Sequence, residues 1–498
     1  MLFNSYVFLF VFLPLLFLLY AILVRSRYGR APLWLLLAGS CVYYAWWDIR
    51  FFGLLAGMIV LNLVLSRILT RRERTRKLWL VIGIAVNLTP LLVFKYADFM
   101  IGSVNTAAGT QFPLWGLVLP IGISFFTFQQ IAYLVDVYRR LTEPHDFLEY
   151  ALFVSFFPQL IAGPIVHHKD FISQIREAVS KITLANVNVA ATLFVVGLFK
   201  KVVLADQLST IASPLFRQAE LHQVLNIYET WTGALAYTFQ IYFDFSAYTD
   251  MALALGFLFG FRLPINFYSP YKSLNIIEFW RRWHISLSSF LRDYIYFPLG
   301  GGRVRIDRKF LNILVTMLIG GIWHGAGWTF LIWGLVHGLA IGANHLWRHL
   351  WKERGGWAGR ACAHVVTFVF LIFTWVIFNS PSFSGAWHFW SEMVPLGGLT
   401  VPTEWVGTLQ SWGISATAHG DYHGTPLAIL LAAGVVVFTL PNTMQLFPGL
   451  YIDHGKLCPG PSRLCWRPSF GWLGFTAGLF LVTIWNMTTV SEFLYYQF

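Results

Sequence analysis

The sequence predicts an all-α, polytopic membrane protein of about 12 spans, and three observations lead to that fold class. The 498 residues are 57% hydrophobic and only 12% charged, against about 25% charged residues in an ordinary soluble domain. Apolar runs of about 20 residues, the length that crosses a bilayer as a helix, recur along the chain. Positive charge gathers in the short loops between these runs, as the positive-inside rule requires. The net charge of +12 is therefore ascribed to membrane topology, and nucleic acid is not expected as a partner.

The first span is predicted at residues 3–24. No charged side chain occurs before Arg25, and the basic residues follow the apolar run instead of preceding it. A cleaved signal peptide has the opposite order, so we expect a membrane helix with an external N-terminus. The other candidate spans are 31–47, 51–69, 78–101, 114–135, 187–205, 226–262 (broken), 311–347 (two pieces), 364–380, 425–442 and 471–490. Lys and Arg are absent from Ala361 to Gly455, which places the polar loop 381–424 outside and both termini with it.

Three segments depart from a simple span. Segment 149–166 is apolar but broken by Pro158 and Pro164, which predicts a re-entrant piece buried in protein. Segment 276–297 mixes aromatic and charged residues, which is typical of a helix at the cytoplasmic interface. Segment 311–347 is too long for one span and rich in glycine, so two packed helices with a break near Gly325 are predicted.

Three histidines are candidates for chemistry. His324, in GGIWHGAGW, lies 15 residues beyond Lys309, which places it on the order of 20 Å into the membrane if the segment is helical. An ionisable group at that depth is costly and indicates function, although a histidine that hydrogen-bonds two helices together explains it equally well. The glycines around it leave room for a substrate or for a close backbone. His284, in WRRWHIS, either faces a substrate at the interface or is solvated there, and His337 is expected to pack beside the centre.

Polar side chains also occur within the apolar stretch QIYFDFSAYTDMALALGF. Gln240, Asp244 and Tyr248 follow one helical face, and Ser246 and Asp250 form a second pair. Such a stripe lines a cavity or holds helices together, and two carboxylates favour the cavity. Lys200 and Lys201 nearby are interpreted as interfacial lysines that extend to water.

Basic residues dominate the stretch from Arg281 to Lys309, which has seven of them and two acids. A phosphate-bearing donor such as coenzyme A would suit Arg281 and Arg282, since a guanidinium binds phosphate through two hydrogen bonds. Cys458 and Cys465 with His454 lack the spacing of a metal site, so neither a metal nor a permanently bound cofactor is expected.

Six long motifs, read in chain order, carry a family resemblance. They are LPIGISFFTFQQIAYLVDVYR (119–139), FFPQLIAGPI (156–165), GLFKKVVLAD (197–206), YFDFSAYTDMALALG (242–256), FWRRWHISLSSFLRDYIYFPLGG (279–301) and GGIWHGAGWTFLIWGLVHG (320–338). The chain resembles the membrane-bound O-acyltransferase family, and within it the bacterial branch that acetylates exopolysaccharides such as alginate. The resemblance is strong over about 80–345, loose over 1–79 and diffuse over 346–498, so one integral membrane domain of residues 1–498 is expected.

The resemblance implies a ring of tilted helices around a central tunnel, with His324 and His284 as the catalytic pair. It implies an O-acetyltransferase of the bacterial inner membrane that takes acetyl from a cytoplasmic donor, expected to be acetyl-CoA. The acceptor would be an extracytoplasmic polysaccharide or a partner acetyltransferase. His324 would be the general base, and His284 would orient the donor or polarise its carbonyl. The candidate substrate-binding residues are Arg281, Arg282, Asp244, Tyr248, Asp250, Trp323, Trp328 and His337.

Two alternatives remain open at this point. The first is transfer of D-alanyl or another acyl group from a carrier-protein thioester to a cell-wall polymer. The second is a non-catalytic transporter or scaffold, against which the sequence has no repeats with paired broken helices. The sequence leaves the polymer and the identity of the partner protein undetermined.

Overall fold

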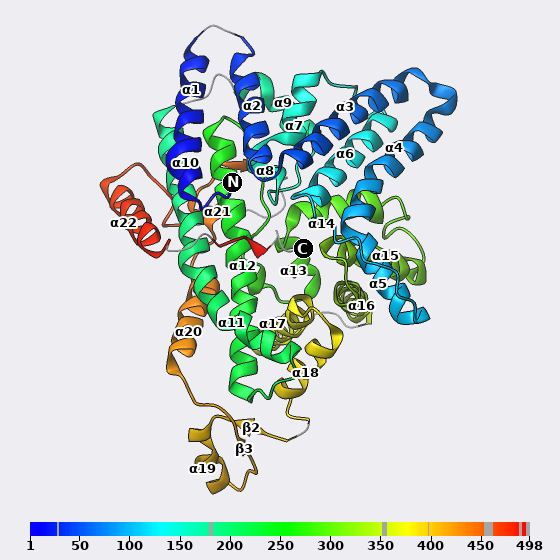
Figure 1. Cartoon of the computed structure of the whole chain (residues 1–498). Helices are drawn as coiled ribbons and strands as arrows, with labels where there is room; N and C mark the ends of the chain where they lie inside the picture. Colours follow the sequence, from blue (N-terminus) through cyan, green and yellow to red (C-terminus); the bar gives the residue numbers. More distant parts are fainter. Residues whose placement is uncertain are drawn as a thin grey trace. The chain divides into compact units, whose positions relative to one another are not determined.

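The computed structural model describes residues 1–26, 29–178, 183–350, 356–396, 398–452, 462–487 and 491–494. The described chain is almost entirely helical (Figure 1). Its strands are two residues long: β1 (Leu263–Pro264) pairs in parallel with β4 (Tyr451–Ile452), and β2 (Thr400–Val401) pairs in parallel with β3 (Thr417–Ala418). The all-α prediction is therefore confirmed.

The helices form two compact units. The first unit comprises Met1–Phe199, Ala247–Ile265 and Thr443–Gln497, and the second comprises Lys200–Ser246 and Asn266–Asn442. The elements of the first unit are η1 (Phe8–Phe12), α1 (Leu13–Arg25), α2 (Ala31–Ala45), α3 (Ile49–Arg71), η2 (Glu73–Thr75), α4 (Arg76–Leu91), η3 (Leu92–Tyr96), α5 (Ala97–Ala108), α6 (Ile123–Tyr138), α7 (Phe147–Ser155), α8 (Phe157–Leu160), α9 (His168–Ala178), α10 (Leu184–Phe199), α21 (Thr443–Leu446) and α22 (Phe470–Asn486), together with β1 and β4.

The second unit contains the segments that the sequence associates with chemistry. Its elements are η4 (Lys200–Ala205), α11 (Asp206–Glu220), η5 (Pro270–Lys272), α13 (Ile276–Arg282), α14 (Ile285–Leu291), η6 (Arg292–Tyr296), α15 (Ile306–His324), α16 (Trp328–Leu350), α17 (Trp357–Asn379), α18 (Phe383–Met393), α19 (Thr403–Ser411) and α20 (Gly424–Thr439), together with β2 and β3. Helix α12 (Ile227–Leu258) supplies its N-terminal part to this unit and its C-terminal part to the first.

Several helices are long and apolar enough to cross a membrane. Among the described residues these are Phe8–Arg25, Ile49–Arg71, Glu73–Ala108, Leu184–Glu220, Trp328–Arg348 and Trp357–Asn379, and α2, α20 and α22 are shorter apolar helices. Large apolar side chains on such helices are exposed: Phe470 and Trp485 of α22 are 92% and 87% exposed. Lipid is the solvent that such surfaces require, so this is a multi-pass membrane protein. The number of 12 spans stays a prediction.

Two predicted spans were wrong in detail. The span predicted at 114–135 becomes helical only at Ile123, because Pro113, Pro120 and the positive φ of Gly116 and Gly122 keep residues 110–120 out of a helix. The segment predicted as broken at 226–262 contains the unbroken helix α12. With 32 residues it is about 48 Å long, more than one bilayer core requires. Its glycines, 233 and 256, lie near its two ends, which leaves the middle without a helix breaker.

For the three irregular segments, two predictions are confirmed and one is wrong. Segment 149–166 is broken as predicted, because α7 ends at Ser155 and α8 starts at Phe157, and every residue between Tyr150 and Val166 is buried. The two helices predicted around Gly325 are confirmed as α15 and α16. The single interfacial helix predicted at 276–297 was wrong, since the chain leaves α13 at Trp283 and begins α14 after His284.

Candidate active site

Glycine contacts bring α15 and α16 together beside His324. A Cβ atom on Gly334 would lie 2.5 Å from the carbonyl oxygen of Met317, and one on Gly321 would lie 2.4 Å from that of Phe330. The backbones therefore touch, as small residues allow in membrane helices. At the end of α15 the ring of Phe330 occupies the space that a Cβ on Gly325 would need. Of the two roles predicted for these glycines, the structure shows the close backbone.

His324 ends α15 inside an aromatic shell. Its side chain is 3% exposed. The ring centroids of Trp323, Trp333 and Phe378 lie 5.0, 5.2 and 5.3 Å from that of His324. Such a site excludes water and strengthens each electrostatic interaction within it.

His284 is held in the left-handed region, with φ +43°, between α13 and α14. Non-glycine residues there are strained, and such strain concentrates at functional sites. Asn266 maintains the turn: its carbonyl oxygen accepts from the N–H of Ile285, and its side-chain oxygen accepts from the hydroxyl of Ser286 at 2.6 Å. Sequence reasoning missed Asn266, which lies outside the six motifs.

His284 is fully buried, so its solvated alternative was wrong. The ring of Phe245 lies 4.7 Å from its ring, and the ring of His324 lies 6.4 Å away. Burial lowers the pKa of His284 to about 3. The imidazole is therefore neutral at cellular pH.

His337, on α16, completes a row of three buried histidines within the second unit. Its Nδ1 accepts a hydrogen bond of 3.2 Å from the indole N–H of Trp280 on α13. Its ring lies 4.5 Å from that of Trp333, one helical turn earlier on the same face. Trp280 and Trp333 were missed as site residues, although the i, i+4 spacing of Trp333 and His337 was readable from the sequence.

The polar side chains of the stripe on α12 have partners within the protein. Asp244 accepts a hydrogen bond of 2.8 Å from Lys201 Nζ, and Lys201 also pairs with Asp206 at 2.9 Å. Lys201 is 2% exposed, so the interpretation that it extends to water was wrong. Tyr248 and Asp250 belong to the first unit. There the ring of Tyr248 lies 5.0 Å from those of Phe3 and Phe493, and Asp250 accepts from the hydroxyl of Thr443 at 3.1 Å.

The structure places the remaining predicted residues around the same second-unit elements. Arg282 pairs with Glu278 at 2.7 Å, while Arg281 is exposed. Arg281 and Lys309 interact electrostatically with His345 near the end of α16. The predicted basic stretch thus continues onto a second helix. Trp323 lies in the shell of His324, whereas Trp328, which starts α16, is 57% exposed.

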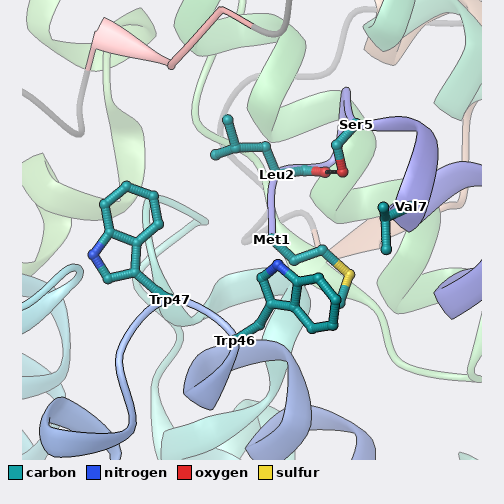
Figure 2. Close-up of a pocket in the computed structure, with 6 residues that line it drawn as sticks. All are labelled: Met1, Leu2, Ser5, Val7, Trp46 and Trp47. Carbon is teal, nitrogen blue, oxygen red and sulfur yellow. Dashed lines mark hydrogen bonds between the residues drawn. The ribbon is translucent and has the colours of Figure 1, made fainter.

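A cavity of about 370 Å³ lies in the first unit and is lined by Met1, Leu2, Ser5, Val7, Trp46 and Trp47 (Figure 2). Among these six, Ser5 has the one hydroxyl, and it donates to the carbonyl oxygen of Leu2 at 2.7 Å. None of the predicted site residues lines this cavity, so it is not the candidate active site. His454 and Cys458 lie outside the described residues, and the described part of the chain has no group of three metal-ligating side chains.

Comparison with known proteins identifies the family of the chain. The model of the MBOAT, membrane-bound O-acyltransferase family, matches residues 90–383, more than half of the chain. The peptidoglycan O-acetyltransferase of Helicobacter pylori is 37% identical over 534 residues, covering 100% of this chain and 98% of that protein.

Two further relatives extend the comparison. A protein of Pseudomonas aeruginosa named probable alginate O-acetylase AlgI is 40% identical over 451 residues, covering 88% of this chain and 81% of the relative. The teichoic acid D-alanyltransferase of Streptococcus thermophilus is 30% identical over 253 residues, covering 49% of this chain and 60% of the relative. All three relatives are named for the transfer of an acyl group. With the family match and the buried histidines, the chain belongs to the membrane-bound O-acyltransferase family and is an acyltransferase of the membrane.

Proposed function

We propose that this enzyme transfers acetyl from acetyl-CoA to a hydroxyl of an extracytoplasmic polysaccharide, directly or through a partner protein, in the bacterial inner membrane. The observation that carries the proposal is the pair of buried imidazoles of His324 and His284, with ring centroids 6.4 Å apart in an aromatic shell. That spacing lets one imidazole serve the acceptor hydroxyl while the other serves the donor. The full-length relatives are named for O-acetylation of peptidoglycan and of alginate, which are both polysaccharides.

In the proposed reaction His324 removes the proton from the acceptor hydroxyl as the oxygen attacks the thioester carbonyl carbon. The carbon–sulfur bond then breaks, and the leaving thiolate takes the proton back from His324. His284, neutral at cellular pH, hydrogen-bonds and orients the donor. The ring of Trp323, 5.9 Å from that of His284 and 5.0 Å from that of His324, contributes to the wall of the site.

Donor entry is assigned to the cytoplasmic side. Basic residues gather from Arg281 and Arg282 to Lys309, and Lys309 Nζ lies 3.4 Å from His345 Nδ1. Guanidinium and ammonium groups there would hold the phosphates of coenzyme A. Asp244 (acting through Lys201), Trp328 and His337, all of the second unit, remain proposed substrate-binding residues, while the roles of Tyr248 and Asp250 in the first unit stay predictions.

D-alanyl transfer is the second candidate. The observation that favours it is the similarity to a teichoic acid D-alanyltransferase, which covers about half of the chain. The polysaccharide O-acetylation relatives cover the chain far more completely, so acetyl transfer is the main proposal.

His324→Ala tests the proposal. General-base catalysis contributes about 10²–10⁴-fold, so the variant should insert normally and lose at least ~10²-fold in acetyl transfer. Purified protein in proteoliposomes, given labelled acetyl-CoA on one face and acceptor on the other, measures both rate and sidedness. His388→Ala, a half-buried histidine on α18, is the matched control and should keep full activity.

Two results would contradict the proposal. If the His324→Ala variant transfers acetyl at the wild-type rate, His324 is not the general base. If transfer requires donor and acceptor on the same face of the membrane, the proposed cross-membrane route is wrong. The protein would then be a one-sided acyltransferase.

A further inference from the structure

Two buried N–H groups beside His324 have no hydrogen-bond partner in the part of the chain that the structure describes. They are the indole Nε1 of Trp333 and the imidazole Nε2 of His337. The two side chains are 1% and 0% exposed. Buried polar groups are nearly always hydrogen-bonded, because leaving a donor unpaired costs free energy. Two such donors side by side therefore need an explanation.

The hydrogen bond from Trp280 fixes the tautomer of His337. An indole N–H can only donate, so His337 Nδ1, which receives it at 3.2 Å, must be unprotonated. The imidazole is therefore neutral and its proton resides on Nε2. His337 presents an N–H donor there, as Trp333 does at Nε1.

The two donors are rigidly placed next to the proposed base. Trp333 and His337 are four residues apart on α16, and their ring centroids are 4.5 Å apart. The ring of Trp333 lies 5.2 Å from that of His324, so Trp333 borders the proposed base and His337 lies on the other contact of Trp333. Gly334, between them in sequence, fixes α16 against α15 through its contact with the carbonyl of Met317.

We propose that Trp333 Nε1–H and His337 Nε2–H bind the carbonyl oxygen of the acyl thioester and stabilise it as an oxyanion. The inference rests on the proposed acyl transfer. As the acceptor oxygen bonds to the carbonyl carbon, its proton passes to His324 and the carbonyl π electrons move onto the oxygen. The two N–H groups hold that negative oxygen. When the carbonyl re-forms, the carbon–sulfur bond breaks and the thiolate leaves with the proton from His324.

Neutral donors suit this role in a dry site. They are already oriented before the charge develops, so no solvent or side chain has to reorganise during the reaction. A cation at the same place would bind anions in the resting enzyme, whereas an uncharged pair favours the transition state over the ground state. The role also accounts for the free energy that two unpaired donors cost the resting protein.

Side-chain exchanges that change only hydrogen bonding test the pair. Trp333→Phe removes one donor and keeps a ring, and His337→Phe removes the other. His337→Gln places an amide N–H near the position of Nε2. Trp347→Phe, an exposed tryptophan on the same helix, is the matched control. Steady-state acetyl-CoA turnover by the full chain gives kcat and KM, and polymer acetyl content in cells gives a readout that does not depend on the donor supplied.

Removal of one donor should lower kcat by about 10²-fold with KM unchanged. His337→Gln should recover part of that loss, which a merely structural role would not produce. Chromatography in detergent checks folding, and if His337→Phe misfolds, Trp333→Phe decides the question alone.

Two outcomes overturn the inference while the proposed function stands. In the first, both phenylalanine variants keep wild-type kcat while His324→Ala is inactive. In the second, KM rises with kcat unchanged, which would make the donors a ground-state contact. If His324→Ala itself retains full activity, the proposed function fails and the oxyanion role fails with it.

Discussion

The amide network of the first unit and the histidine–tryptophan cluster of the second both place polar side chains deep among apolar helices. In the first unit, Asn62 of α3 and Asn87 of α4 exchange hydrogen bonds of 2.9 and 2.8 Å. Asn62 also donates to Gln130 of α6 at 2.8 Å. All three side chains are 0% exposed, and each helix of the trio bonds to another through these amides.

The cluster of the second unit is built differently. Trp280 donates to His337, but Trp333 Nε1 and His337 Nε2 have no hydrogen-bond partner within the described chain. Asn62 and Asn87 hold α3 to α4 because each uses its amide N–H₂ group on the other, whereas Nε2 of Gln130 has no partner within the described chain. Donors left over beside a histidine, which cost stability, indicate a substrate. The two regions therefore differ in what surrounds the unpaired donor, since Trp333 lies in the aromatic shell of His324.

The largest effect on stability should come from charge. Lys201→Met would leave Asp244 and Asp206 buried or half-buried without their cation, and removal of one partner of a buried ion pair costs about 3–5 kcal/mol. A large drop in melting temperature in detergent is expected. Lys200→Met, at the half-buried neighbour, should have a much smaller effect. Equal melting temperatures for the two variants would contradict the structural role of the ion pair.

The amide network should affect stability without affecting catalysis. Asn62→Ala leaves Asn87 and Gln130 without their shared partner, at a cost of about 1–3 kcal/mol. The melting temperature should fall while the activity of each folded molecule stays at the wild-type value. Asn62→Leu with Asn87→Leu removes both amides of the pair and should cost less than the single change. If Asn62→Ala instead lowered kcat and left the melting temperature unchanged, the network would have a role in catalysis and not in stability.

Removal of the hydrogen bond that fixes the His337 tautomer should lower the turnover rate moderately. Trp280→Phe keeps a ring but removes the N–H donor to Nδ1, so the proton of His337 can move to either nitrogen. Loss of a group that orients a catalytic side chain costs about 10-fold or more. Turnover per folded molecule should fall by about that factor, and the melting temperature should fall as well, because the buried Nδ1 loses its donor. An unchanged rate would show that the tautomer is irrelevant to the reaction.

Much of the fold was readable because apolar length and loop charge act locally. The span predicted at 51–69 corresponds to α3, and the break predicted near Gly325 lies between α15 and α16. The misses came from backbone geometry. Because of two prolines and two glycines with positive φ, α6 begins later in the sequence than predicted. The break between α13 and α14 lies at His284, where neither proline nor glycine marks it.

The candidate site was predictable in its histidines but not in their partners. The motifs and the membrane depth singled out His324 and His284, and the structure brings their rings to 6.4 Å. The pairing of Trp280 with His337 joins residues 57 positions apart, so no local pattern contains it. Lys201 was misread for the same reason, because Asp244 lies 43 positions away.

By itself the sequence determined that this chain is a helical membrane protein of an acyltransferase family, and it predicted a site centred on two histidines. These properties depend on hydrophobic runs, loop charge and motifs, which are all local in sequence. Only the tertiary structure decided which buried polar groups are satisfied and which are left to meet a substrate. A hydrogen bond requires two groups within about 3 Å in the right orientation, and between distant helices that condition is set by packing alone.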